Sequence, residues 1–320
     1  MRRAGRILVV IALAMIGSAF PKSLNAEPVS KEQLSFDTNP GRGVKLAKLS
    51  ATLYLPRSTN PVSTMVIISS SGGVLDWIEG YYARELAKSG IGALVVDSFK
   101  PRGVRNVIAN QSLVSSWDME NDAFAALAEL QKDKRIDPSR IGLMGLSKGG
   151  LVAQNAAFMI RRKLRGTDSS AFAVHVPIAP DCTVQFRDTQ TTKKPIFYML
   201  AELDDADPSA ACTEYAHRIT VSGNSNVEVK IYKGAHHNWE MTKPVVYAEK
   251  AQNFSKCTRL IEDNGDRTFL AGNIRIKAED EYSWMVKNCM SMGEHVGGGT
   301  EKLKQQAADD LVAFLKRNGF

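Results

Sequence analysis

Seven short apolar runs, separated by segments of helical periodicity, constrain the fold of this chain more than any other feature of the sequence. Each run is five to seven residues long and almost continuously apolar, which is typical of strands buried on both faces of a parallel sheet. The order of the runs predicts a doubly wound α/β fold, with a mostly parallel sheet covered by helices on both faces. The runs span residues 51–55, 65–69, 92–97, 141–146, 172–178, 196–201 and 227–232.

Helical periodicity is clearest in two segments between the runs and at the end of the chain. Residues 79–89 and 119–130 each place apolar side chains on one helical face. Residues 301–318 are predicted to form a last helix that closes the fold. We therefore expect a single domain over residues 47–320, with its ligand at the carboxyl ends of the strands, where sheets of this kind bind ligands.

The N-terminus is predicted to be a signal peptide over residues 1–26. Residues 1–6 are basic, residues 7–20 are almost all apolar, and Ala26 supplies a small residue for cleavage. The apolar run is short for a membrane span, although an uncleaved anchor is the alternative. The pattern predicts export to the periplasm or to the outside of the cell, with no stable membrane anchor after cleavage.

The charge of the chain comes largely from this N-terminal segment. Its removal takes away four basic residues and no acidic one, so the formal charge falls from +7 to +3. The remaining basic residues form no stripe that would bind nucleic acid, and residues 161–165 are better explained as the cationic end of a helix. Residues 27–46 are polar, contain Pro40 and Gly41, and are predicted to be a loose lead-in.

The four cysteines predict two disulfides. An even number of cysteines behind a signal peptide favours disulfides over free thiols, and the chain has no C-x-x-C pair and no histidines at metal-binding spacing, so no metal is expected. Four cysteines allow three pairings. The economical one joins neighbours along the chain, Cys182 to Cys212 and Cys257 to Cys289.

Residues 244–300 interrupt the alternation of strands and helices. Within them, Asn264-Gly265 is a strong hairpin signal between residues 257–262 and 267–270. We expect a disulfide-tied insertion that carries a small hairpin. The sequence leaves open whether this insertion forms a lid over a site.

The segment Gly145-Leu-Ser-Lys-Gly149 has the G-x-S-x-G pattern of a nucleophile elbow. The pattern alone is weak, because the same glycines could serve a simple turn. Its context is the required one, since a predicted strand precedes Ser147 and a helix rich in small residues follows it. A phosphate-binding loop is excluded because Lys148 follows a serine, whereas that motif needs a glycine before the lysine.

A base and an acid follow later strands in the order that the elbow requires. A serine hydroxyl becomes nucleophilic when a histidine takes its proton and a carboxylate orients the histidine. The run at 196–201 is followed by several acids in residues 202–207, and the run at 227–232 is followed by His236 and His237. The residues alone leave the choice of acid and histidine open.

Together with "VVDSFKPRG", the motifs "RIGLMGLSKGG", "AELDDADPSAAC" and "YKGAHHNWE" resemble the dienelactone hydrolase family of the α/β-hydrolase fold. The resemblance covers residues 47–240 and the last helix. It implies Ser147 as nucleophile, Asp204 as acid and His237 as base, with Asp205 as the fallback acid. Members of the family place the acid four residues before a proline and the histidine two residues before an aromatic residue.

The same resemblance implies further site residues. The oxyanion hole would consist of the backbone amides of Lys148 and of Ser71, the latter in the loop where relatives carry a histidine-glycine motif. Arg102 stands where relatives have an arginine that binds a substrate carboxylate, although a surface ion pair is an equal alternative.

The expected activity is hydrolysis of a small-molecule ester or lactone, without a cofactor, by an exported serine hydrolase. The best-known members of the family use a cysteine nucleophile, so the serine resembles wider esterase and serine-peptidase relatives. Peptidase or acyltransferase activity is a variant of this hypothesis. The alternative is an exported ligand-binding protein that keeps the fold without catalysis.

Overall fold

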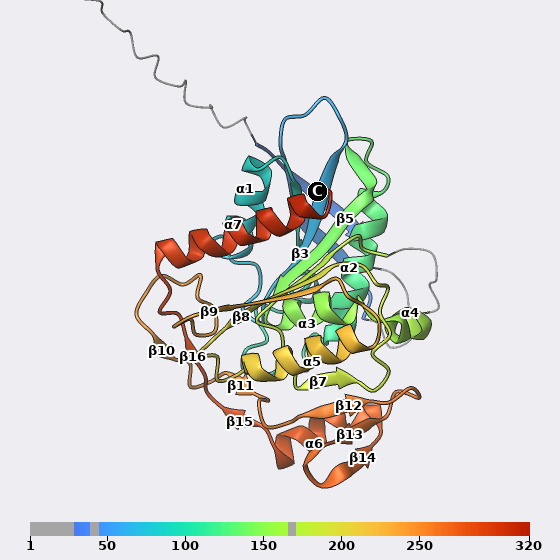
Figure 1. Cartoon of the computed structure of the whole chain (residues 1–320), viewed down its shortest axis with the longest axis vertical. Helices are drawn as coiled ribbons and strands as arrows, with labels where there is room; N and C mark the ends of the chain where they lie inside the picture. Colours follow the sequence, from blue (N-terminus) through green and yellow to red (C-terminus); the bar gives the residue numbers. More distant parts are fainter. Residues whose placement is uncertain (1–28, 39–44, 166–170) are drawn as a thin grey trace, which may run out of the picture.

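An eight-stranded mixed sheet forms the centre of the protein (Figure 1). The computed structural model describes residues 29–38, 45–165 and 171–320. The strands of the sheet are β1 (Ser30–Asp37), β2 (Lys48–Leu55), β3 (Val62–Ile68), β4 (Gly92–Asp97), β5 (Ile136–Leu146), β6 (His175–Ile178), β8 (Ile196–Ala201) and β9 (Val227–Tyr232). Their order is β1-β2-β4-β3-β5-β6-β8-β9. All are parallel except β1 and β2 at one edge, and all seven predicted strands are present.

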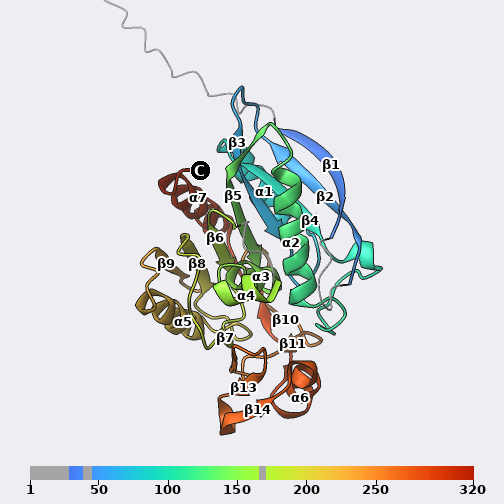
Figure 2. The same cartoon turned by 90° about the vertical axis from the view of Figure 1, so that its right-hand side faces the viewer.

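Helices cover both faces of this sheet, as the sequence predicts (Figure 2). They are α1 (Glu79–Lys88), α2 (Ser116–Leu130), α3 (Lys148–Asn155), α4 (Met159–Arg165), α5 (Ser209–Val221) and α7 (Glu301–Arg317). Helices α1 and α7 pack on one face, and α2, α3 and α5 pack on the other. Strand β3 shows why its run is continuously apolar: Met65 and Ile67 face α1, whereas Val66 and Ile68 face α2.

The predicted loose lead-in is wrong for residues 30–37, which form β1. This strand pairs antiparallel with β2 from Ser30 opposite Leu55 to Asp37 opposite Lys48. Its sequence signal is weak because an edge strand with one exposed face needs few apolar residues. The predicted signal peptide at 1–26 lies outside the described residues. Within the described ranges, no helix is both long and apolar enough to cross a membrane.

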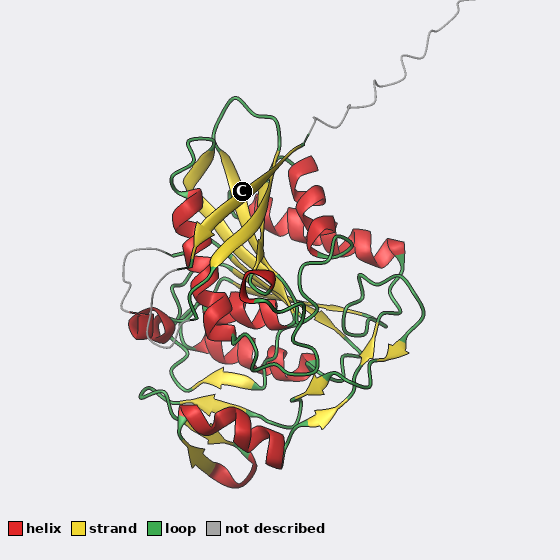
Figure 3. Cartoon of the chain, turned by 180° about the vertical axis from the view of Figure 1, so that it is seen from behind, coloured by secondary structure: helices red, strands yellow, loops and turns green. Residues whose placement is uncertain are grey.

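Residues 244–300, called the insertion below, leave the sheet after β9 and return at α7 (Figure 3). The insertion contains β10 (Val246–Tyr247), β11 (Gln252–Asn253), β12 (Arg259–Ile261), β13 (Arg267–Phe269), β14 (Ile274–Ile276), α6 (Glu281–Asn288), β15 (Ser291–Met292) and β16 (His295–Val296). The outgoing and returning chain pair as β10–β16 and β11–β15. Strands β12 to β14 extend a small sheet from β7 (Val184–Phe186) of the main fold.

Both disulfides that the sequence predicts are formed. Cys182 and Cys212 join the loop after β6 to α5, with their Cα atoms 4.9 Å apart. Cys257 and Cys289 join the start of β12 to the end of α6, with their Cα atoms 5.3 Å apart. The predicted hairpin is also present, because β12 and β13 pair antiparallel around Gly265, whose φ is 87°.

Candidate active site

Ser147 occupies the sharp turn between β5 and α3. Its backbone has φ 52° and ψ −117°, a positive-φ conformation that residues other than glycine rarely adopt and that costs roughly 1–3 kcal/mol. The surrounding backbone leaves room only for glycines. A Cβ on Gly149 would lie 2.3 Å from the carbonyl oxygen of Ile68, and a Cβ on Gly145 would lie 2.4 Å from that of Gly149. This is the geometry of the nucleophile elbow.

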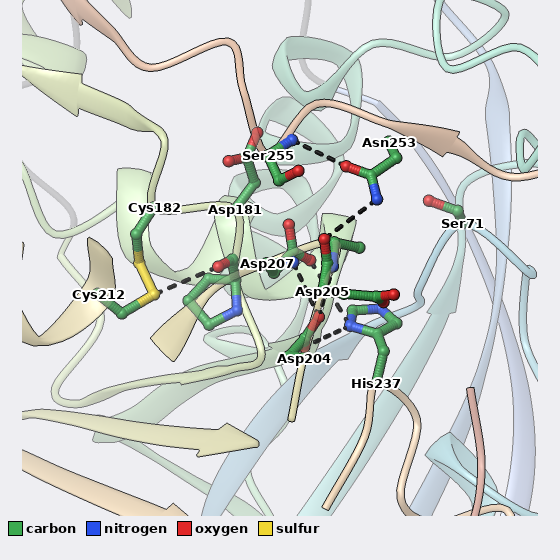
Figure 4. Close-up of polar contacts among 12 residues, drawn as sticks. Ser71, Asp181, Cys182, Asp204, Asp205, Asp207, Cys212, His237, Asn253 and Ser255 are labelled. Carbon is green, nitrogen blue, oxygen red and sulfur yellow. Dashed lines mark hydrogen bonds and ion pairs between the residues drawn. A yellow bond between two sulfur atoms is a disulfide. The ribbon is translucent and has the colours of Figure 1, made fainter. Parts of the chain in front are cut away.

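His237 and Asp204 form a buried hydrogen-bonded pair at the carboxyl ends of β9 and β8 (Figure 4). The His237 Nδ1 lies 2.7 Å from the Asp204 Oδ2. The other carboxylate oxygen of Asp204 accepts the backbone amides of Ala206 at 3.1 Å and Asp207 at 2.8 Å. A carboxylate at Nδ1 favours the imidazole tautomer whose Nε2 is free to accept a proton.

Asp205, the fallback acid, does not reach His237. Its exposed carboxylate pairs with His295 of the insertion, with 2.7 Å between the Asp205 Oδ2 and the His295 Nδ1. The side chain of Asn253 donates to the Asp205 carbonyl at 3.1 Å (Figure 4). The geometry therefore favours Asp204 as the partner of the histidine. Asp205 instead connects the loop after β8 to the insertion.

The loop after β3 contains the first predicted oxyanion donor, the backbone amide of Ser71. The amide of Ser70 donates to the Glu79 Oε1, and those of Gly72 and Gly73 donate to the Oγ and the carbonyl oxygen of Ser70. Among the described residues, the amide of Ser71 has no acceptor. An unpaired amide at this place is what an oxyanion hole needs.

The second predicted oxyanion donor is the amide of Lys148, the first residue of α3. The first amides of a helix have no acceptor within the helix and carry the positive end of its dipole. The Lys148 amide also has no acceptor elsewhere in the described part of the chain. Ser71 and Lys148 contact the same cavity as Ser147. The two amides are therefore available to a negatively charged oxygen.

The cavity has a volume of about 550 Å³ and is lined by Ser147 and His237. Residues of the insertion, from Ala248 to Val296, form much of the remaining wall of the cavity. Among the described residues, the Ser147 Oγ makes no hydrogen bond, and its contact with His237 is not formed in this conformation. Such contacts are often long in unliganded enzymes and tighten when substrate binds.

A model of the dienelactone hydrolase family matches residues 49–260, which is more than half of the chain. The chain belongs to the dienelactone hydrolase family. It is therefore a hydrolase that acts on ester bonds. The match contains Ser147, Asp204 and His237, whereas most of the insertion lies beyond it.

Solved structures similar to this hydrolase are α/β-hydrolases and esterases. An esterase from Pyrobaculum calidifontis has 19% identity and a TM-score of 0.50, over 67% of this chain and 78% of that one. Esterase 2 from Thermogutta terrifontis has 16% identity and a TM-score of 0.48, over 65% and 84%. An α/β-hydrolase from a Medee basin deep-sea metagenome library has 17% identity and a TM-score of 0.47, over 66% and 86%. The family match, the sheet topology and the likeness to the Pyrobaculum esterase agree with the predicted α/β-hydrolase fold. The comparison with curated protein sequences found no match.

Two further carboxyl groups of the hydrolase surround His237. The Asp207 Oδ2 lies 3.7 Å from the His237 Nδ1, and Glu294 of the insertion lines the same cavity. Burial raises the pKa of Asp207 well above its usual value and also raises that of Glu294, although the charge of His237 opposes both shifts. Asp207 stands in the acidic run that the sequence singles out, but no sequence signal could have found Glu294.

The neighbouring carboxyl groups shift the pKa of His237. Burial alone would lower the pKa of His237, but the carboxylates of Asp204, Glu294 and Asp207 raise it well above the usual value. Within the described residues, Asp204, Asp207 and His237 form the one group whose three ligand atoms would suit a metal ion. Two members of this group, His237 and Asp204, are already joined by a hydrogen bond through the His237 Nδ1.

Arg102, predicted to bind a substrate carboxylate, is not among the residues that line the cavity. Its buried guanidinium forms two hydrogen bonds with the Asp122 carboxylate, 2.7 and 2.9 Å long. The same guanidinium donates to the carbonyl oxygens of Ser98 and Lys45. The position after β4 was correctly identified, but the side chain turns toward α2 and joins three segments of the main fold.

Proposed function

We propose that this hydrolase is an exported serine hydrolase that cleaves a small-molecule ester or lactone through Ser147, His237 and Asp204. The observation that carries the proposal is the buried 2.7 Å contact between His237 and Asp204, next to a cavity that also contains Ser147 on its elbow. A strained serine and unpaired amides lower the stability of the fold, and such strain is typical of active sites. Together with an oriented histidine, they support a catalytic role.

The reaction follows from the roles of these groups. His237, held by Asp204, takes the proton of Ser147 while the serine oxygen attacks the ester carbonyl. The amides of Ser71 and Lys148 donate to the negatively charged oxygen of the tetrahedral intermediate. Collapse of the intermediate releases the alcohol, which receives the proton from His237. Water then hydrolyses the acyl-enzyme by the same steps and regenerates Ser147.

Export to the periplasm or outside the cell is part of the proposal. The predicted signal peptide at 1–26 motivates it, and two disulfides are compatible with an oxidising compartment. The N-terminal sequence of the protein recovered from cells tests this part. A mature chain that begins at Glu27 supports export with cleavage, and a chain that retains residues 1–26 contradicts the predicted cleavage.

A fluorophosphonate tests the catalytic part of the proposal. Intact-mass and peptide mapping of the oxidised protein should reveal one adduct on Ser147, and Ser147→Ala should remove it. Ser112→Ala is the matched control, because Ser112 lines the same cavity away from the elbow and should leave the labelling unchanged. Folded protein without an adduct would favour the second candidate function, a ligand-binding protein. The observation that favours this candidate is the missing contact between Ser147 and His237.

A further inference from the structure

Gln111 lies where the loop before α2, the loop after β3 and the insertion meet, and all of its polar groups are hydrogen-bonded. It lines the cavity but touches neither the histidine nor its acid. Its backbone amide and carbonyl oxygen and both atoms of its side-chain amide have partners. A residue at a cavity wall whose polar groups are all hydrogen-bonded is suited to fixing the positions of its neighbours.

Two of these neighbours carry the amides proposed for the oxyanion hole. The Gln111 Nε2 donates to the Ser71 Oγ at 2.8 Å. The Lys148 Nζ donates to the Gln111 Oε1 at 3.0 Å and to its carbonyl oxygen at 2.7 Å. Gln111 therefore bridges the loop after β3 and the start of α3. The bridge is made by the Ser71 hydroxyl and the Lys148 Nζ, side-chain groups of the two residues whose amides are proposed as oxyanion donors.

The other side of Gln111 contacts the insertion. The Gln111 amide donates to the Gln252 Oε1 at 2.8 Å. The Gln252 Nε2 donates to the Tyr282 hydroxyl at 2.8 Å, and that hydroxyl donates to the Asn110 Oδ1 at 2.9 Å. These hydrogen bonds form a continuous chain from α6 of the insertion, through Gln111, to the loop after β3.

We propose that Gln111 is a positioning residue that fixes the spacing of the Ser71 and Lys148 amides and links this spacing to the insertion. The inference rests on the proposed function. Oxyanion donors act through their geometry, so small shifts in either amide weaken binding of the transition state more than binding of the substrate. The insertion thereby acts on catalysis as well as on access to the cavity.

Gln111→Met and Gln111→Glu form the central test, with 4-nitrophenyl butyrate as substrate. The methionine has a similar volume but makes neither side-chain hydrogen bond, so kcat should fall on the order of tenfold to a hundredfold with KM nearly unchanged. The glutamate can still accept from Ser71 and Lys148 and should restore most of kcat. Affinity for an alkylboronic acid, whose serine adduct mimics the tetrahedral intermediate, should fall in parallel with kcat/KM.

Ser71→Ala supplies a second route if Gln111→Met does not fold. It removes the hydroxyl that contacts Gln111 and keeps the amide. Where all proteins fold, the double variant should lose little more than the larger single loss, because both changes break one contact. Additive losses, or a raised KM with unchanged kcat, would overturn the positioning role.

Tyr282→Phe tests the link to the insertion, with Tyr247→Phe as the matched control. Tyr247 is also in the insertion, but its hydroxyl donates to the Met292 carbonyl outside this chain of hydrogen bonds. We expect Tyr282→Phe alone to lower kcat and boronate affinity together. Equal kinetics of the two variants would remove the link.

Labelling of Ser147 by fluorophosphonate separates failure of this inference from failure of the proposed function. An unlabelled wild-type protein overturns the proposed function, whereas a labelled protein whose kcat is insensitive to Gln111→Met overturns only this inference.

Discussion

Replacement of Arg102 separates the role that the sequence suggests from the one that the structure supports. The guanidinium is 6% exposed and its partner Asp122 is 0% exposed, so neither charge has much access to water. Arg102→Ala would leave the Asp122 carboxylate buried without its cation. We expect the variant to lose stability and to keep its relative activity on acidic and neutral esters.

The magnitude follows from burial. Removing one partner of a buried ion pair costs about 3–5 kcal/mol, because the remaining charge stays desolvated. The pair formed by Arg135 and Glu32 is the matched control, because these side chains are 50% and 36% exposed. Exposed pairs contribute about 0–1 kcal/mol, so Arg135→Ala should have a small effect.

Urea unfolding measures the difference. Arg102→Ala should lower the midpoint strongly with an unchanged slope, which would indicate a loss of stability rather than a change in the exposed surface. The double variant Arg102→Met with Asp122→Leu should recover much of the loss, because apolar residues replace both charges. The reasoning is refuted if Arg102→Ala matches Arg135→Ala in stability or selectively loses activity on acidic esters.

Two further predictions concern Lys148 and the insertion. Burial lowers the pKa of Lys148 from 10.5 to about 7, although the negative charge of Asp118 acts in the other direction. Between pH 7 and pH 10.5 the folded state therefore binds fewer protons than the unfolded state. The wild-type protein should therefore gain stability relative to Lys148→Met as pH rises from 7 to 10.5, measured by urea unfolding at several pH values; a constant difference would contradict this. The disulfide between Cys257 and Cys289 closes a loop with a sequence separation of 32 residues, so its loss should cost up to about 4 kcal/mol. Limited proteolysis of Cys257→Ser with Cys289→Ser should cut the insertion first, and resistance equal to that of wild type would argue against it.

The strands of the main sheet were predictable because helices cover both of its faces. Every side chain of β3 and β8 is buried, and such runs stand out in a sequence. Strand β1 has alternating exposure at the sheet edge, and the strands of the insertion are only two or three residues long, too short to show periodicity. Helix α5 also has a helical signal in the sequence, because Cys212, Tyr215 and Ile219 recur at helical spacing.

The residues of the candidate site also fall into those that the sequence predicts and those that it does not. Ser147, Asp204 and His237 follow the carboxyl ends of strands, so sheet topology predicts that they meet. Gln111 comes from the loop before α2 and Glu294 from the insertion, segments without periodicity, and only tertiary packing brings them to the cavity. Arg102 shows the limit of positional reasoning, because the direction of a long side chain depends on a partner in another helix.

The two disulfides join cysteines that are consecutive in the chain, and their loops do not overlap. Cys182 and Cys212 are both synthesised before Cys257, so the first bridge can close while no competing cysteine exists. The second pair then meets only its own partner. Oxidation in the order of synthesis would therefore lead directly to the native pairing, without reshuffling of mispaired bridges.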